Sequence, residues 1–390
     1  MQKKLATRVY TWGAGDAGQL GVETENASAP APIELPFFSD KNITSIVCGG
    51  MHSLALSEDG TLFSWGCNDE GVLGREGNEE EPEKVNFPEK IKIKKVVAGD
   101  SISAAVDQNG SLWTWGLFRG PGGVIGHAKR RNETVKMQRT PEIVPRIKVR
   151  TLAAGCNHLA VVDTRGRLFT WGDGATGALG RYISKRKGVE EGLIPRVALT
   201  GVSDVVAGAY HTMAVKEEES TRIKRRKVST DGEREETCLI TFSGVNNFGQ
   251  APGASPTGKW APWREDKNLK TFRKGMGGEH STHVLDTRGR LWAVGRNTFG
   301  QLGVGDDKNR QEFTKCRIEN VADFAITAAH ALAIADGKLF SWGFGEEEQL
   351  GYEAQKQMDP REVALPSGEV PISVGAGGQH SAVVTACHEK

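Results

Sequence analysis

The chain has 390 residues, with 50 basic and 49 acidic side chains, so its formal net charge is only +1. This balance excludes a uniformly basic nucleic-acid-binding protein and requires any charged partner to meet a local patch. The sequence contains no run of 18 apolar residues and no basic-then-apolar leader, so we expect neither a membrane span nor secretion. Its six cysteines form no CxxC pair, which is typical of reduced thiols in a reducing compartment.

A five-residue phrase ending in glycine occurs seven times along the chain. It reads VYTWG at 9–13 and LFSWG at 62–66, and the later copies end at Gly116, Gly172, Gly244, Gly295 and Gly343. The largest step between closing glycines is 72 residues (244 − 172) and the smallest is 48 (343 − 295). A repeat of about fifty residues with several strands in each unit is typical of propeller blades.

A small-residue turn and an alternating apolar segment precede the phrases, as in GGMHSLALS from Gly49 and GCNHLAVVD from Gly155. Tight-turn pairs such as Asp59-Gly60 and Asn109-Gly110 separate this segment from the phrase. Glycine after Asp or Asn supplies the positive φ that a two-residue hairpin needs. Each unit is therefore predicted to contain an antiparallel hairpin of half-buried strands.

The two ends of the chain complement each other. The first phrase, from Val9, has no partner strand before it, and the last partner strand, 381–385, has no phrase after it. We therefore predict an all-β fold: a monomeric seven-bladed β-propeller over residues 1–390, closed by pairing of the N-terminal and C-terminal strands. The longest repeat holds a charged insert, 216–237, which its composition predicts to be disordered.

Hairpin geometry predicts which features share a face of the propeller. Because one strand's start lies beside its partner's end, the histidine turns should lie on the same face as the loops that leave the phrases, and the Asp-Gly turns on the opposite face. The first face then collects the loop 118–125 and Asp16, His52, Asp69, Asp100, His158, His211, His280 and His380. No nucleophile elbow, metal-ligand spacing or phosphate-binding glycine loop occurs, so we predict no covalent catalysis, no metal and no cofactor.

The most specific segments are GCNDEGVLGR at 66–75, AGDSISAAV at 98–106 and LFRGPGGVIG at 117–126. With the repeat as a whole, over roughly 8–385, they resemble the regulator of chromosome condensation family. The resemblance implies a nuclear, chromatin-associated guanine-nucleotide exchange factor for the small GTPase Ran. It also implies a wedge loop pushed against the phosphate-binding region of the GTPase.

The resemblance assigns two groups of residues on the predicted face. The first, implied to drive nucleotide release, comprises Asp100, Phe118, Arg119, Gly120, Pro121, Gly122, Gly123, Val124 and Ile125. The second, implied to bind Ran, comprises Asp16, His52, Asn157, Arg181, His280 and His380. Asn157 stands where the family commonly has an acid, so this position keeps its hydrogen-bonding shape and loses its charge.

Several alternatives stay open. A histidine that recurs in a repeat is more often structural, satisfying a buried polar group in each blade. Similar repeats serve as non-catalytic platforms that bind other proteins, and a related repeat forms the plant ultraviolet-B photoreceptor. Seven of the nine tryptophans lie in blade phrases here and no GWRH motif occurs, which argues against the photoreceptor. Trp260 and Trp263 either pack over the degenerate fifth blade or form an exposed docking spot.

Two basic clusters are candidates for contact with nucleosomal histones and DNA phosphate, or with a nuclear import receptor. They are Lys185, Arg186 and Lys187 after the fourth phrase, and Lys224, Arg225, Arg226 and Lys227 in the insert. Contacts of this kind depend on charge and weaken with salt. The plainer alternative is that these loops are simply solvated.

Overall fold

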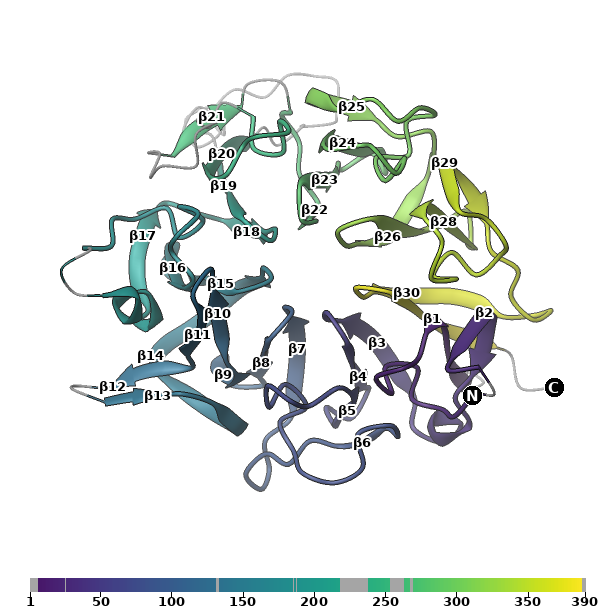
Figure 1. Ribbon diagram of the computed structural model, residues 1–390, viewed down its shortest axis with the longest axis horizontal. Coiled ribbons are helices and arrows are strands. Elements are labelled where there is room, and N and C mark those ends of the chain that lie inside the picture. The colour runs from purple at the N-terminus through teal and green to yellow at the C-terminus, as the bar shows by residue number, and fades with distance from the viewer. Residues whose placement is uncertain are drawn as a thin grey trace, which may run out of the picture.

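The computed structural model describes residues 6–24, 26–130, 133–184, 186, 188–217, 238–252, 263–266 and 269–387. Its strands form seven four-stranded units arranged in a ring, which confirms the predicted propeller (Figure 1). We number the blades 1 to 7 in the order of their phrases. Within the described ranges, no helix is long and apolar enough to cross a membrane.

Each blade has an inner, a second, a third and an outer strand. The inner strands are β30 (Val370–Ala376), β3 (Ile43–Cys48), β7 (Ile93–Ala98), the end of β14 (Gln138–Ala154), β18 (Asp204–Ala207), β22 (Lys274–Gly277) and β26 (Val321–Ile326). The second strands are β31 (His380–Cys387), β4 (His52–Ser57), β8 (Ile102–Asp107), β15 (His158–Asp163), β19 (His211–Glu217), β23 (Ser281–Leu285) and β27 (His330–Ala335).

The third strands contain the repeated phrases. They are β1 (Ala6–Ala14), β5 (Leu62–Gly66), β9 (Ser111–Gly116), β16 (Arg167–Gly172), β20 (Cys238–Gly244), β24 (Leu291–Gly295) and β28 (Lys338–Phe344). The outer strands are β2 (Ser28–Glu34), β6 (Glu83–Lys84), the start of β14, β17 (Arg196–Thr200), β21 (Arg264–Asp266), β25 (Arg310–Lys315) and β29 (Lys356–Glu362). The long β14 is the outer strand of blade 3 and continues as the inner strand of blade 4, so these two blades form one seven-stranded sheet.

Aspartates at the ends of second strands stabilise the predicted hairpin turns. Oδ1 of Asp107 accepts hydrogen bonds from the backbone N–H groups of Asn109 (2.8 Å) and Ser111 (2.9 Å). Asp163 and Asp286 do the same in blades 4 and 6. A side-chain acceptor that replaces a missing backbone partner favours the turn over a continued strand.

The tryptophans of the phrases connect neighbouring blades. Trp12, Trp65, Trp115 and Trp342 are fully buried between sheets. Each donates its indole N–H to a backbone carbonyl of the preceding blade, for example Trp65 to Gln19 at 3.0 Å and Trp342 to Gln301 at 3.0 Å. A buried tryptophan contributes a large apolar surface, and its one polar atom needs such a partner. The phrase therefore serves packing between blades as well as pairing within them.

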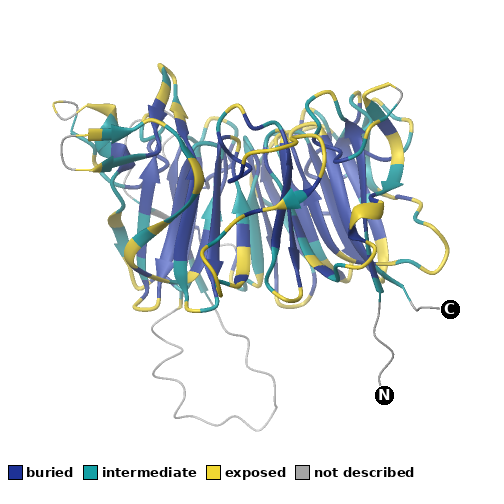
Figure 2. Cartoon of the chain, turned by 90° about the horizontal axis from the view of Figure 1, so that it is seen from below, coloured by how far each residue is buried: buried dark blue, intermediate teal, exposed yellow. Residues whose placement is uncertain are grey.

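The two ends of the chain close the ring as predicted. β1 pairs antiparallel with β31, with Val9 opposite Val384 and Gly13 opposite His380. Arg8 strengthens the closure, because its Nη1 lies 3.0 Å from Oε1 of Glu369, whose side chain is almost completely buried. The blades form a buried middle between two exposed rims of loops (Figure 2). The pairing covers the edge of β31 that would otherwise be exposed where the ring opens.

The structure of blade 5 bears on two predictions, the start of the insert and the location of Trp263. Lys216 and Glu217 belong to β19 and pair with Leu239 and Cys238, so the insert begins two residues later than predicted. Its remainder, 218–237, lies outside the described residues. Trp263 packs against blade 4 and donates its indole N–H to the carbonyl of Gly180 at 3.1 Å, which favours the packing interpretation. Trp260 lies outside the described residues.

Candidate functional site

The propeller has two distinct faces, as the hairpin argument predicts. We call front face the rim that carries the turns between inner and second strands, at 49–51, 99–101, 155–157, 208–210, 278–280, 327–329 and 377–379. The loops that leave the phrases lie on the same rim, because each phrase glycine pairs with the first residue of a second strand, as Gly66 does with His52. The opposite rim, the back face, carries the Asp-Gly turns.

Five histidines form hydrogen bonds between blades just below the front face. In each pair, Nε2 of the histidine lies 2.7 to 3.0 Å from a hydroxyl in the next blade around the ring. The pairs are His52 with Ser103, His158 with Thr212, His211 with Thr282, His330 with Ser381, and His380 with Ser53. Four of these hydroxyls also donate to a carbonyl, as Ser103 does to Val72 at 2.9 Å, so Nε2 must be the donor in those pairs.

These five histidines are buried and neutral. Their exposed fractions are 0 or 1%. Burial lowers the pKa of His158 to about 4 and that of His52, His211, His330 and His380 to about 3. These five histidines therefore fit the interpretation that a recurring histidine satisfies a buried polar group. The direct partner contact predicted for His52 and His380 is corrected, because side chains without exposed surface can act on a partner only through the turns they hold.

The exceptions in blades 3 and 6 support this interpretation. Ile102 stands in the histidine position of blade 3, and the next blade has Leu159 where a hydroxyl would be. Ser281 stands there in blade 6, and the next blade has Ala331. The hydroxyl is thus absent in the two blades where the preceding blade lacks a histidine, as expected if a buried polar group requires its partner.

His280 consequently does not match the other histidines, although GGEHSTHVL resembles GGMHSLALS. Ser281, not His280, pairs with the phrase glycine of blade 6, so the turn is shifted by one residue. His280 therefore lies on the front face and half-buried, between the rings of Tyr210 and Phe248, with centroid distances of 5.4 and 4.8 Å. The predicted location of His280 on this face is kept, while its equivalence to His52 is wrong.

The shifted turn gives Asp100 a counterpart that the sequence analysis missed. Asp100 follows Gly99 in the turn of blade 3 as Glu279 follows Gly278 in the turn of blade 6, since both glycines make the same turn hydrogen bond. The surrounding turns desolvate the Asp100 carboxyl group and so raise its pKa. A hydrogen bond with Cys156 lowers this pKa, and the negative charges of Glu279 and Glu70 raise it further. No lysine or arginine in the part of the chain that the structure describes forms an ion pair with the Asp100 carboxylate.

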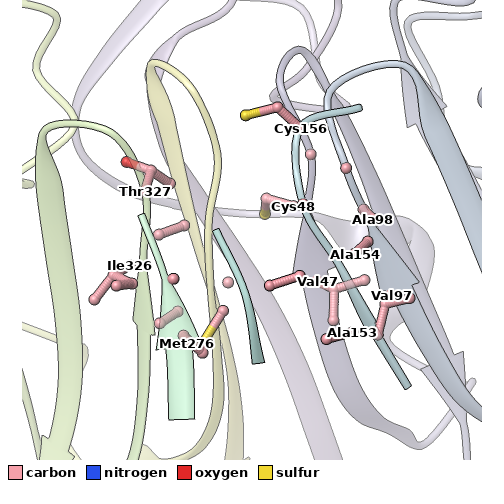
Figure 3. Close-up of a pocket in the computed structure, with 18 of the residues that line it drawn as sticks. Val47, Cys48, Val97, Ala98, Ala153, Ala154, Cys156, Met276, Ile326 and Thr327 are labelled. Carbon is pink, nitrogen blue, oxygen red and sulfur yellow. The ribbon is translucent and has the colours of Figure 1, made fainter. Parts of the chain in front are cut away.

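These acids border the front opening of the central channel. The channel encloses a cavity of about 1120 Å³, which Asp100, Glu279, Glu70 and Arg119 help to line at its front end. Its middle is apolar, with Val47, Val97, Ala153, Met276 and Ile326 along the wall and Cys156 and Thr327 toward the front turns (Figure 3). Charged groups at the starts of inner strands, among them Lys95, Asp204, Lys274 and Asp323, also line the cavity, whereas Asp100, Glu279, Glu70 and Arg119 are charged groups at its front mouth.

The predicted wedge is a short β-hairpin that leaves blade 3 on the front face. β10 (Phe118–Gly120) pairs with β11 (Gly123–Gly126). The backbone N–H of Arg119 donates to Oδ1 of Asn157 at 2.8 Å, and the Arg119 guanidinium pairs with Glu70. A Cβ added at Gly122 or Gly123 would meet no atom within 4 Å, so the tip is surrounded by open space. The wedge and Asp100 share one face, as predicted.

The two ends of the wedge are anchors, which corrects part of its prediction. Phe118 is fully buried and Ile125 is 5% exposed. Both pack in one cluster with Leu193 of η3 (Val189–Leu193), a 3₁₀ turn in the outer loop of blade 4. Phe118 and Ile125 therefore cannot contact a partner directly, and the surface of the wedge available to one is Arg119 to Val124. A second hairpin, β12 (Ala128–Arg130) with β13 (Glu133–Val135), follows it.

Arg181 stabilises its own blade. Its guanidinium donates to the carbonyls of Thr170 (3.1 Å), Gly192 (3.3 Å) and Ile194 (3.0 Å), and burial lowers its pKa to about 10. Arg75, at the same place in blade 2, donates to the carbonyl of Ser64 at 2.8 Å. Arg181 therefore clamps η3 and, through Leu193, the base of the wedge, and its direct contact with Ran stays a prediction.

The remaining predicted residues are placed as follows. Asp16 is exposed in the front loop of blade 1 and accepts a hydrogen bond from Gln19 at 3.1 Å. Arg186 is exposed. Lys185, Lys187, Lys224, Arg225, Arg226 and Lys227 lie outside the described residues.

The sequence held signals for the residues that were missed. In the turn of His330, Thr327 stands where the turns of the other four histidines have a glycine, such as Gly49, so this turn looked unlike the others, but the alternating strand after it was visible. The shift at Ser281 is marked by the hydroxyl of Thr282, which stands one residue later than the hydroxyls of Ser53 and Ser381 relative to the preceding glycine pair. Glu70, the partner of Arg119, has no sequence signal, because their pairing depends on how blades 2 and 3 pack.

Known proteins resemble this chain over nearly its whole length. A family model described as "RCC1-like domain" matches residues 8–383. The chain is 31% identical over 411 residues to the "Regulator of chromosome condensation" of Xenopus laevis, covering 97% of this chain and 89% of that protein. It is 28% identical over 439 residues to the "Guanine nucleotide exchange factor SRM1" of Saccharomyces cerevisiae, covering 96% and 86%.

The structure agrees with solved relatives to the same extent. It superimposes on Prp20p from Saccharomyces cerevisiae, in a study of that protein's binding to Gsp1p and histones, with a TM-score of 0.84, 28% identity and coverage of 100% of this chain and 93% of that one. A second structure, Kap60 bound to yeast RCC1 (Prp20), matches with a TM-score of 0.84, 27% identity and coverage of 100% and 90%.

Proposed function

We propose, from the premise that this chain belongs to the RCC1-like domain family, that it is a guanine-nucleotide exchange factor for the small GTPase Ran. The observation that carries the proposal is the position of the wedge. Its exposed tip, Arg119 to Val124, projects from the same face as Asp100, and its base is fixed by Asn157 and Leu193. A rigid projection beside the acids Asp100 and Glu279 suits the displacement of a phosphate-binding loop.

The proposed mechanism needs no covalent step. Exchange requires only that the propeller and the nucleotide weaken each other's binding to one GTPase, and by thermodynamic linkage the two effects are equal. The wedge tip would displace the phosphate-binding loop of the GTPase. Asp100 and Glu279, which form no ion pair with a lysine or arginine among the described residues, would attract the lysine that otherwise holds phosphate. The choice of the next nucleotide is then left to its supply.

We further propose that exchange takes place on chromatin in the nucleus. Histones are named for the yeast relative Prp20p, and the import receptor Kap60 is bound to it in the second structure. In this chain, Lys185, Arg186 and Lys187 are the candidate contacts to nucleosomal acids or DNA phosphate, and Lys224, Arg225, Arg226 and Lys227 are candidates for chromatin or an import receptor. Charge-driven contacts of this kind should weaken as salt rises.

The test measures release of labelled GDP from purified Ran. We expect Asp100→Ala, and separately a chain in which Gly120–Val124 is replaced by a two-residue turn, to slow release at least tenfold. Lys338→Ala is the matched control, because Lys338 is exposed on the back face and pairs only with the exposed Glu362. Release as fast as with the unmodified chain would refute the assignment. Tight binding of Ran without accelerated release would instead indicate a non-catalytic platform.

A further inference from the structure

A continuous strip of aromatic rings and one arginine crosses the front face of blades 5 to 7. Its members contact one another in sequence, and all are half-buried: Tyr210, His280, Phe248, Arg296, Phe299 and Phe344. The Arg296 guanidinium lies 5.4 Å from the ring centroids of both Phe248 and Phe299. The strip ends with Phe299 and Phe344, whose centroids are 5.0 Å apart.

The repeat does not require these side chains. Phe248 and Phe299 occupy a loop position at which the backbone N–H donates to a glutamine two residues later, and the same bond is made by Ala17 in blade 1 and Glu347 in blade 7. The loop thus folds equally with a methyl group or a carboxylate. Its geometry therefore gives no reason for two half-exposed phenylalanines.

The repeat does not require Arg296 or Phe344 either. Arg296 and Phe344 directly follow their phrase glycines, and their N–H groups bond to the second-strand turn as those of Ala14 and Cys67 do in blades 1 and 2. Blades 5 to 7 therefore bring aromatic rings and an arginine together. At the corresponding positions the other blades have Ala14, Cys67, Leu117 and Asp173 after the phrase glycine, and Ala17, Glu70 and Thr176 in the loop. Clusters of Tyr, Phe and Arg on a rigid surface are typical of the residues that contribute most to protein binding.

We infer that this strip is a docking surface for the same small GTPase that the wedge engages, and that it contributes binding affinity and not nucleotide release. The inference rests on the proposed function. It commits to that partner because the strip lies on the wedge face and adjoins the channel mouth, where His280 is the direct neighbour of Glu279. The six wedge residues from Arg119 to Val124 also fall well short of the roughly 20–30 residues that a specific interface uses on each side. A partner seated on the wedge needs further contact area on this face.

The strip suits a mixed apolar and acidic patch on the GTPase. Arg296 stacks between two rings and its Nε–H donates to the Thr298 hydroxyl at 2.9 Å, so its guanidinium face is covered while its Nη N–H groups remain able to pair with a carboxylate. The rings have few rotatable bonds, so ordering them on binding costs little conformational entropy. Both features favour a stable complex without contact to the nucleotide.

The experiment measures exchange on Ran as a function of Ran concentration, so that KM and kcat are separated. We expect Phe299→Ala and Arg296→Ala to raise KM about tenfold with kcat within twofold, whereas loss of the wedge tip lowers kcat. Phe37→Ala is the control, because Phe37 is an exposed aromatic residue of η1 (Pro36–Phe38), away from the front face. Thermal unfolding of each variant checks that the propeller is intact, and Arg296→Ala removes no buried core side chain.

The outcomes separate the two proposals. Unchanged KM in both strip variants, with wedge variants still impaired, overturns the docking surface and leaves the exchange function standing. A fall in kcat at unchanged KM also overturns it, because the strip would then act on release. No exchange by the unmodified chain on Ran overturns the proposed function itself. In that case, direct binding of nucleotide-free Ran tests the strip by itself. If the strip docks the GTPase without catalysis, Phe299→Ala and Arg296→Ala should each weaken the affinity for Ran about tenfold.

Discussion

The backbone N–H of Arg119 donates a hydrogen bond to Oδ1 of Asn157 at 2.8 Å, which ties the wedge of blade 3 to the front turn of blade 4. Asn157 occupies the position where an acid is expected from the family resemblance. The amide supplies the acceptor that this bond needs, so the neutral side chain keeps the positioning role that an acid would have. Substitutions at Asn157 that keep or remove this acceptor can therefore measure the effect of having an amide in place of the acid.

We predict different results for two substitutions at Asn157. Asn157→Ala removes the acceptor and should slow nucleotide release about fivefold, since one hydrogen bond contributes about 1 kcal/mol. Asn157→Asp keeps the acceptor and should remain within about twofold of the unmodified chain. Single-turnover release of labelled GDP measures both. Equal loss in the two variants would show that the amide group itself, and not its acceptor oxygen, is required.

Leu193 is predicted to position the wedge from a neighbouring blade. Leu193→Ala should lower the free energy of unfolding by about 2–4 kcal/mol, because Leu193 is 1% exposed and packs with Phe118 and Ile125. It should also slow release at a temperature where the chain is folded, since the base of the wedge loses its support. Leu339→Ala is the matched control, being equally buried in a cluster remote from the wedge. If both variants lose stability and neither loses exchange, the support is not needed.

The histidine–hydroxyl pairs predict a stability cost for removing a hydroxyl. Ser103→Ala leaves the Nε2–H of His52 buried without an acceptor, which should cost about 1–3 kcal/mol. His52→Ala combined with Ser103→Ala tests the coupling, because the second substitution should cost less once the histidine is gone. Urea unfolding gives the four free energies of this cycle. Additive losses would mean that the two side chains stabilise the fold independently.

Buried histidines also predict sensitivity to acid. Each of the five has a folded-state pKa of about 3 to 4, below its ordinary value of 6.5, so the unfolded chain binds protons that the folded chain cannot. Their stability contribution is therefore complete above about pH 6.5 and declines as the pH falls toward 3. At pH 5 the loss should be roughly 2 kcal/mol for each histidine.

Urea unfolding at several pH values between 7 and 5 measures this loss. His330→Gln should be less stable than the unmodified chain at pH 7, and its stability should depend on pH with a slope smaller by about one proton. A free energy of unfolding that is the same at pH 7 and pH 5 would contradict the prediction.

The number and spacing of the repeats in the sequence were enough to predict seven blades, their hairpins and the closing pair of β1 with β31. They also predicted that Asp100 and the wedge lie on the same face. These features depend on neighbours in the chain: alternating side chains, Asp-Gly turns and glycines that close each phrase act within one hairpin. Strand alternation also fixes which end of a hairpin meets which loop, so faces can be assigned without coordinates.

Only the tertiary structure decided which side chains on that face can reach a partner. His52 and His380 look exposed in a turn, yet the hydroxyls that bury them come from other blades, 51 and 327 residues away in the chain. Arg181 is held by carbonyls of its own outer loop, and His280 is moved to the surface by a one-residue shift that its motif conceals. Burial arises from packing between blades, and no local pattern records what a distant strand will place against a side chain.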